Sequence, residues 1–112
     1  MIRVVVADAD DASRATVVAA LEGNGCIVCG AAQSAEAVVA AAMEQRPDVV
    51  VIDVGLPGNG ITAARELARR LPSTALGFEQ WRKLVLTIDD LVRQHPDLAG
   101  VAILHGTATI EE

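Results

Sequence analysis

The pattern of hydrophobic and polar positions centres on one apolar run in the middle of the chain. Residues 49–52 are four consecutive β-branched residues, which cannot alternate between a buried and an exposed face. The run therefore predicts a strand buried on both faces, typical of a parallel sheet with helices above and below it. Asp53 follows directly and opens a loop rich in glycine and proline, so its carboxylate is expected at the carboxyl end of this central strand.

Strands and helices alternate along the chain as far as residue 71, and the pattern then changes. Up to that point it predicts strands over residues 2–7, 26–31 and 49–52, and helices over about residues 12–22, 34–46 and 61–71. This alternation predicts an α/β fold with right-handed crossovers and a parallel sheet. Residues 73–77 then supply at most a fragment of a strand, a long amphipathic helix over 78–94 follows the previous helix, and a short strand over 101–104 comes last.

Length and composition exclude several classes of protein. A chain of 112 residues is one domain, and no apolar run approaches the roughly 18 residues of a membrane span, so no membrane is expected as a partner. The chain enters a strand at once, without a signal peptide, which predicts a cytoplasmic protein. A net charge of −6 argues against nucleic acid as a direct ligand. Cys26 and Cys29 are expected on opposite faces of a strand, where they cannot share a metal or a disulfide.

Acidic residues follow two of the predicted strands. The carboxyl ends of parallel strands lie at one edge of a sheet, so Asp8 or Asp10 is expected near Asp53 if their strands are neighbours. Clustered carboxylates need a cation, and oxygen ligands suit Mg²⁺, beside which a carboxylate can act as a nucleophile toward phosphorus. The alternative is that these acids only cap the amino ends of helices.

Residues 3 to about 72 resemble a bacterial response-regulator receiver domain. The resemblance is carried by Val-Val-Ala-Asp at residues 5–8 and by the segment from Pro47 through Asp53 to Gly58. It implies a flavodoxin-like fold in which Asp53 accepts a phosphoryl group from a histidine kinase, while acids after the first strand hold Mg²⁺. Receivers usually carry an adjacent acidic pair there, and Ala9 occupies its second position. The Ser or Thr and the Lys that later receiver strands supply also have no counterpart, since no lysine follows Lys83.

The end of the chain resembles a different family. Residues 105–112, His-Gly-Thr-Ala-Thr-Ile-Glu-Glu, are similar to an active-site motif of the bacterial-type L-asparaginases, and the resemblance extends over residues 73–112. It implies that Thr107 matches a threonine serving amide hydrolysis, although Ala108 replaces an aspartate that binds substrate. The alternative for Thr107 is a turn or a helix cap. His105 is expected at the same edge of the sheet as Asp53, where the two could contribute to a mixed metal site.

Together these features predict a single hybrid domain over residues 1–112, joined near residue 72. The sequence is interpreted as an engineered chimera of two α/β folds, a three-layer sandwich with about four parallel strands in the order 2-1-3-4. It is expected to have no enzymatic activity, no required cofactor, and acidic and threonine sites that are only inherited. The alternatives are a working phosphoacceptor module centred on Asp53, with a histidine kinase as partner, and a residual amidohydrolase centred on Thr107.

The predicted hybrid leaves part of its sheet uncovered. Helices 34–46 and 61–71 are expected on one face, and only helix 12–22 on the other, unless helix 78–94 crosses over. Burial of each exposed apolar side chain is worth about 1.5–3 kcal/mol, so we expect a homodimer or an exchange of the C-terminal helix and strand between chains.

Overall fold

The computed structural model describes residues 1–71 and 76–96 and the backbone of residues 101–105. Four strands and four helices lie in these ranges, in the order β1 Arg3–Ala7, α1 Asp11–Gly23, β2 Ile27–Ala32, α2 Ala35–Gln45, β3 Val49–Asp53, α3 Gly60–Arg70, α4 Phe78–Gln94 and β4 Val101–His105. The predicted junction at residues 72–75 and the predicted site residue Thr107 lie outside the described residues. None of the described helices is long and apolar enough to cross a lipid bilayer.

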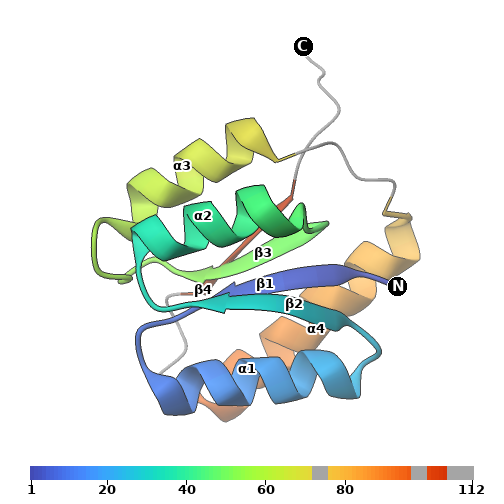
Figure 1. The fold of residues 1–112 in the computed structure, drawn as a ribbon. Helices are drawn as coiled ribbons and strands as arrows, with labels where there is room; N and C mark the ends of the chain where they lie inside the picture. Colours follow the sequence, from blue (N-terminus) through green and yellow to red (C-terminus); the bar gives the residue numbers. More distant parts are fainter. Residues whose placement is uncertain (72–75, 97–100, 106–112) are drawn as a thin grey trace.

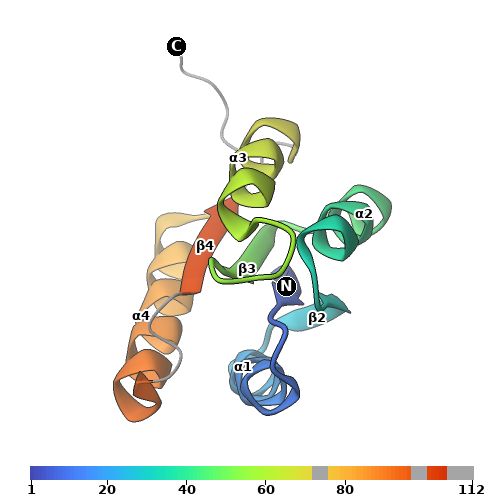
Figure 2. The same ribbon diagram turned by 90° about the vertical axis from the view of Figure 1, so that its left-hand side faces the viewer.

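The strands form one sheet in the order β2-β1-β3-β4, as the sequence predicts. Strand β1 pairs in parallel with both β2 and β3. The chain therefore leaves β1 in one direction through α1 and returns past it through α2. Because both crossovers are right-handed, this change of direction places α1 and α2 on opposite faces. Figures 1 and 2 show the resulting three layers, with α2 and α3 on one face of the sheet and α1 and α4 on the other.

Two apolar cores fill the space between the layers. Residues of β1 and β3 alternate between them: Val5 and Val50 pack toward α2 and α3, whereas Val4 and Val51 pack toward α1 and α4. All of these side chains are at most 2% exposed, which confirms the prediction of a central strand buried on both faces. The two cysteines follow the same alternation, since Cys29 packs against the first core and Cys26 against the second, and both are free thiols.

Helix α4 covers the face of the sheet that the sequence left open. Its buried side chains Leu84, Ile88 and Leu91 belong to the same core as Val17 and Leu21 of α1. The helix crosses to the α1 side because its apolar stripe can be buried only against an uncovered sheet face. This corrects the expectation of an open face, and with it the reason for expecting a homodimer or an exchange of the C-terminal helix and strand.

Strand β4 runs antiparallel to β3, which corrects the prediction of a fully parallel sheet. The chain reverses direction at each connection between one element and the next. Two helices, α3 and α4, separate β3 from β4, so the chain reaches the sheet edge pointing the opposite way. Val101 pairs with Asp53 and His105 pairs with Val49. His105 therefore lies about 13 Å along the strand from the level of Asp53, and the predicted mixed site of Asp53 and His105 is wrong.

Candidate functional site

The carboxyl ends of β1 and β3 form the point of the sheet at which the order of strands reverses. Open α/β sheets bind ligands in the crevice at such a point, because the loops there diverge to opposite faces. Ala7 pairs with Ile52, so the next residues of the two strands, Asp8 and Asp53, leave the sheet at the same level. The structure thus brings together the two acids that the sequence predicted to be neighbours.

Asp8 is the buried member of this pair. Asp8 is only 5% exposed, and its Oδ1 accepts a 2.9 Å hydrogen bond from the backbone N–H of Asp10. Burial raises the pKa of Asp8, and the negative charges of Asp53 and Asp10 raise it further, against the opposing effects of the Asp10 N–H and of Arg14. Asp53 therefore lies close enough to Asp8 for its charge to disfavour ionisation of the Asp8 carboxyl group.

Asp53 is half-buried at the end of β3, in a loop that glycine makes possible. The backbone N–H of Gly55 donates a 3.0 Å hydrogen bond to its Oδ1. Gly60, at the start of α3, lies so close beneath the loop that a Cβ atom there would meet the carbonyl oxygen of Val54 at 2.7 Å. Asn59 then caps α3 by accepting a hydrogen bond from the N–H of Thr62. The loop therefore holds the Asp53 carboxylate on a tightly packed backbone.

Asp10 has a different role from Asp8. Its Oδ2 accepts a 2.8 Å hydrogen bond from the backbone N–H of Ser13 and caps the amino end of α1. Hydrogen bonds from Ser13, chiefly the one from its backbone N–H, lower the pKa of Asp10. The helix-cap alternative thus describes Asp10. Within the described ranges, no three His, Cys, Asp or Glu side chains gather closely enough to hold a metal ion.

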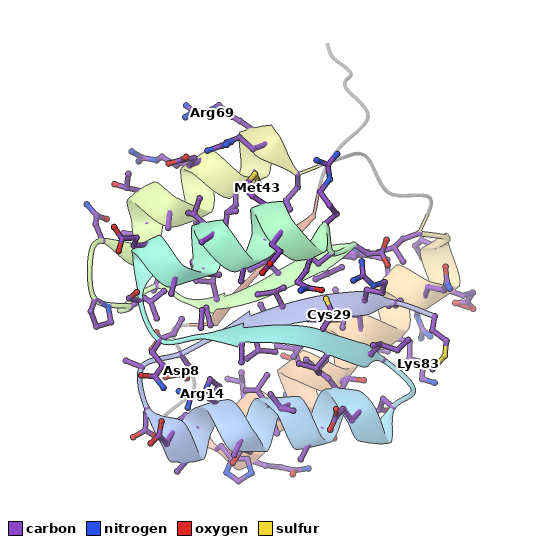
Figure 3. The ribbon with its side chains drawn as sticks, viewed as in Figure 1. Asp8, Arg14, Cys29, Met43, Arg69 and Lys83 are labelled. Carbon is purple, nitrogen blue, oxygen red and sulfur yellow. The ribbon has the colours of Figure 1, made fainter. Side chains whose placement is uncertain are left out.

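Arg14 adds a fixed cation to this edge of the sheet, a residue that the sequence analysis did not single out. Its guanidinium donates a 2.8 Å hydrogen bond to the carbonyl oxygen of Asp8 and pairs with Asp11 at 2.6 Å. The side chain is only 17% exposed, and Figure 3 shows it directly beside Asp8. Arg14 follows the helix cap Asp10 by four residues, which places it one turn into α1 and on the same side of the helix as the cap. This spacing is the sequence signal that could have identified it.

An Asp8 and Asp53 pair can hold a divalent cation. Mg²⁺ in proteins is commonly held by one or two carboxylates, with water and substrate phosphate completing its octahedron. In the described part of the chain, the second carboxylate oxygen of buried Asp8 has no hydrogen-bond partner, and buried polar atoms normally have one. The donor set therefore fits a hard cation with oxygen ligands, with two carboxylates where three were predicted.

A sheet with this topology and a pair of acids at its switch point defines the class of the chain. The family model for the response regulator receiver domain matches residues 4–78, more than half of the sequence. The chain belongs to the response regulator receiver domain family. This confirms the receiver resemblance and the flavodoxin-like α/β fold.

Relatives and a solved structure agree with this assignment. The chain is 42% identical over 104 residues to the response regulator GacA of Pseudomonas viridiflava, which is 92% of this chain and 38% of the relative. It is 37% identical over 76 residues to a protein-glutamate methylesterase/protein-glutamine glutaminase of Haloarcula marismortui, which is 67% of this chain and 21% of the relative. The chain thus spans well under half the length of these curated relatives.

The signal receiver domain of a modulated diguanylate cyclase from Desulfovibrio desulfuricans G20, described as an example of alternate folding, shares the fold. Its TM-score is 0.62 with 22% sequence identity, and the match covers 88% of this chain and 93% of that chain.

The similarity to response regulators runs across residue 72, where two parent families were expected to meet. The family match ends at residue 78, and a GacA match over 104 of 112 residues must include part of the segment assigned to an asparaginase. The findings give no support to an asparaginase fragment over residues 73–112 or to an engineered chimera.

Proposed function

We propose that this chain is a phosphoacceptor module of two-component signalling, in which Asp53 takes a phosphoryl group from a histidine kinase. The observation that carries the proposal is the buried Asp8 carboxylate beside Asp53 at the switch point of the sheet, in a chain of the receiver family. This function ranks above the inactive hybrid expected from the sequence, because the similarity to response regulators does not stop at residue 72.

The proposed reaction is a transfer between two nucleophiles. A carboxylate oxygen of Asp53 attacks the phosphorus of a phosphohistidine, the phosphorus–nitrogen bond breaks, and the imidazole leaves with that electron pair. The product is an acyl phosphate on Asp53. The Gly55 N–H fixes the orientation of the Asp53 carboxylate, and the tightly packed loop keeps it at the edge of the sheet.

Asp8 and Asp53 would hold Mg²⁺ in this module. The ion would neutralise negative charge on the phosphoryl oxygens, which lowers the barrier to attack by a carboxylate. Ala9 offers no carboxylate, and that of Asp10 is engaged at the helix cap, so we expect weaker Mg²⁺ affinity than a third acid would give.

The cation that would face the phosphoryl group also differs from the family pattern. The single lysine of the chain, Lys83, lies on α4 beside Asn24 and Cys26, at the amino ends of β1 and β2 and away from Asp53. Arg14 is the cation that the structure fixes at the acidic edge, through its hydrogen bond to Asp8. We assign it the role of balancing charge there.

Beryllium fluoride, which binds a carboxylate as a phosphoryl analogue, tests this site at equilibrium. With MgCl₂ present, it should raise the midpoint of thermal unfolding of the wild-type protein. At 100 times its Kd, the free energy of unfolding should increase by about 2.7 kcal/mol. Asp53→Asn should abolish the shift, whereas Asp11→Asn, a change of the same kind at the same edge, should retain it. Absence of any shift in the wild type, or an equal shift in Asp53→Asn, would contradict the proposal.

A further inference from the structure

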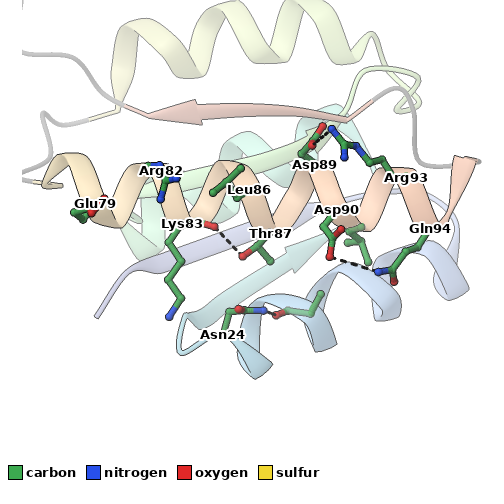
Figure 4. A pocket seen from close by; sticks show the side chains of 12 residues that line it. Asn24, Glu79, Arg82, Lys83, Leu86, Thr87, Asp89, Asp90, Arg93 and Gln94 are labelled. Carbon is green, nitrogen blue, oxygen red and sulfur yellow. Dashed lines mark hydrogen bonds and ion pairs between the residues drawn. The ribbon is translucent and has the colours of Figure 1, made fainter.

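The outward face of α4 carries a stripe of charges around one leucine. The stripe lies opposite the buried side chains of the helix and lines an open groove of about 760 Å³ between α4 and α1. Figure 4 shows these side chains from close by. In chain order the stripe consists of Glu79, Arg82, Lys83, Leu86, Asp89, Asp90 and Arg93. Their spacings of three and four residues place them all on one side of the helix.

The order of charges in this stripe reverses sign about Leu86. The basic pair Arg82 and Lys83 precedes Leu86 by three to four residues, and the acidic pair Asp89 and Asp90 follows it at the same distances. Each pair therefore lies about 4.5–6 Å along the helix from Leu86. Glu79 and Arg93 are each seven residues from Leu86, one on either side, and are also opposite in charge. An antiparallel copy of the helix, centred on Leu86, thus meets an opposite charge at every level.

We propose that this face binds a second copy of the chain, with the two α4 helices antiparallel about a two-fold axis that passes beside Leu86. A two-fold interface uses the same patch on both subunits, so a patch that complements its own reversed copy is what such an interface requires. A parallel arrangement would place like charges level with each other, and its repulsion selects against that alternative.

The side chains also divide correctly between the two flanks of the helix. Figure 4 shows Arg82 and Asp89 on the side of α4 away from α1, and Lys83 and Asp90 on the side toward α1. A two-fold rotation keeps each flank on its own side, so Arg82 faces Asp89 of the second copy and Lys83 faces its Asp90. The Arg82–Asp89 contact and its symmetry copy therefore lie on one flank, and the Lys83–Asp90 contact and its copy lie on the other.

The energetics indicate a weak association that depends on salt. Leu86 is 49% exposed and supplies apolar contact at the centre of the patch. Asp89 already pairs with Arg93 on its own helix at 3.0 Å, but both side chains are at least half exposed, and such pairs contribute little. One face of a 17-residue helix is a small interface, so electrostatic complementarity sets its geometry and specificity more than its strength.

This proposal is independent of phosphorylation at Asp53, and it does not depend on the uncovered sheet face that the sequence suggested. Helix α4 buries its apolar side within its own subunit, and the inferred contact uses the opposite side. The inferred dimer therefore leaves both cores and the acidic edge of the sheet intact.

Sedimentation velocity over a series from about 10 µM to about 1 mM, a range suited to weak complexes, tests the association. At low salt the wild-type mass should rise with concentration toward twice that of the monomer, and about 0.5 M NaCl should weaken the association. A wild-type protein that stays monomeric throughout, or a dimer that ignores salt, would overturn the proposal.

Charge exchange identifies the face. The double variants Arg82→Glu/Lys83→Glu and Asp89→Lys/Asp90→Lys should each raise the dimer Kd at least about tenfold, because attractive pairs become repulsive. An equimolar mixture of the two should associate again. The Asp89–Arg93 pair that the second variant removes is exposed and contributes little to the stability of α4, and circular dichroism checks that both variants stay folded. Arg69→Glu on α3, a charge reversal at another exposed site, should dimerise like the wild type. Unchanged dimerisation of the double variants, or no association of the mixture, would refute this interface.

Discussion

Replacing Leu84 by alanine tests whether α4 completes the core. Leu84 is 2% exposed and packs in the core that contains Val4, Val6 and Leu21. The change removes three buried carbon atoms, worth about 0.8 kcal/mol each, and leaves a cavity, so we expect a loss of about 3 kcal/mol within the usual range of about 2–5 kcal/mol. For 112 residues this lowers the midpoint of thermal unfolding by about 13 °C.

Leu86→Ala is the matched control, two residues along the same helix. Leu86 is 49% exposed, and its replacement by alanine changes helix propensity by the same amount as Leu84→Ala. The free energy of unfolding should fall by less than about 0.5 kcal/mol. Thermal unfolding of both variants is followed by circular dichroism at low protein concentration, where the proposed dimer is dissociated. Equal destabilisation by the two changes, or a negligible effect of Leu84→Ala, would refute the placement of α4 on the α1 face.

Two further substitutions probe the acidic edge. Asp8→Asn should stabilise the protein at neutral pH, because burial and the nearby acids raise the pKa of Asp8 in the folded state. The folded protein favours the protonated form of Asp8. This preference stabilises the fold fully below pH 3.8, and the stabilisation is lost as pH rises through the raised pKa. Denaturation at several pH values should therefore show the benefit of asparagine vanish at acid pH. Gly60→Ala should destabilise by about 1–3 kcal/mol through the clash with the Val54 carbonyl, whereas Gly23→Ala, with open space, should be neutral or slightly stabilising.

The strand order and most element boundaries could be predicted because the local signals were strong and agreed with one another. The unbroken β-branched run at residues 49–52 required two covered faces, and Pro47 and Ser34 mark where α2 must end and begin. Right-handed crossovers then left few ways to arrange three strands. The pairing of Asp8 with Asp53 followed from that arrangement alone, since each acid ends one of two neighbouring parallel strands.

The direction of β4 was missed although the sequence contained the signal. Two successive helices between β3 and β4 imply three reversals of chain direction, an odd number, so helix 78–94 already indicated that the last strand runs against β3. The side of the sheet that α4 occupies is a tertiary property, decided by which face lacks a cover. Arg14 was missed for a related reason: its value depends on the carbonyl of Asp8 lying within reach, which only the fold determines.

The direct test of the central claim is covalent. Incubation of the protein with acetyl phosphate and MgCl₂, followed by intact mass spectrometry, should show the addition of one phosphoryl group, and peptide mapping should place it on Asp53. Asp53→Asn should show none, Asp11→Asn should match the wild type, and omission of Mg²⁺ should slow the reaction. A wild-type protein that gains no phosphoryl group, or gains it at a residue other than Asp53, would contradict the account.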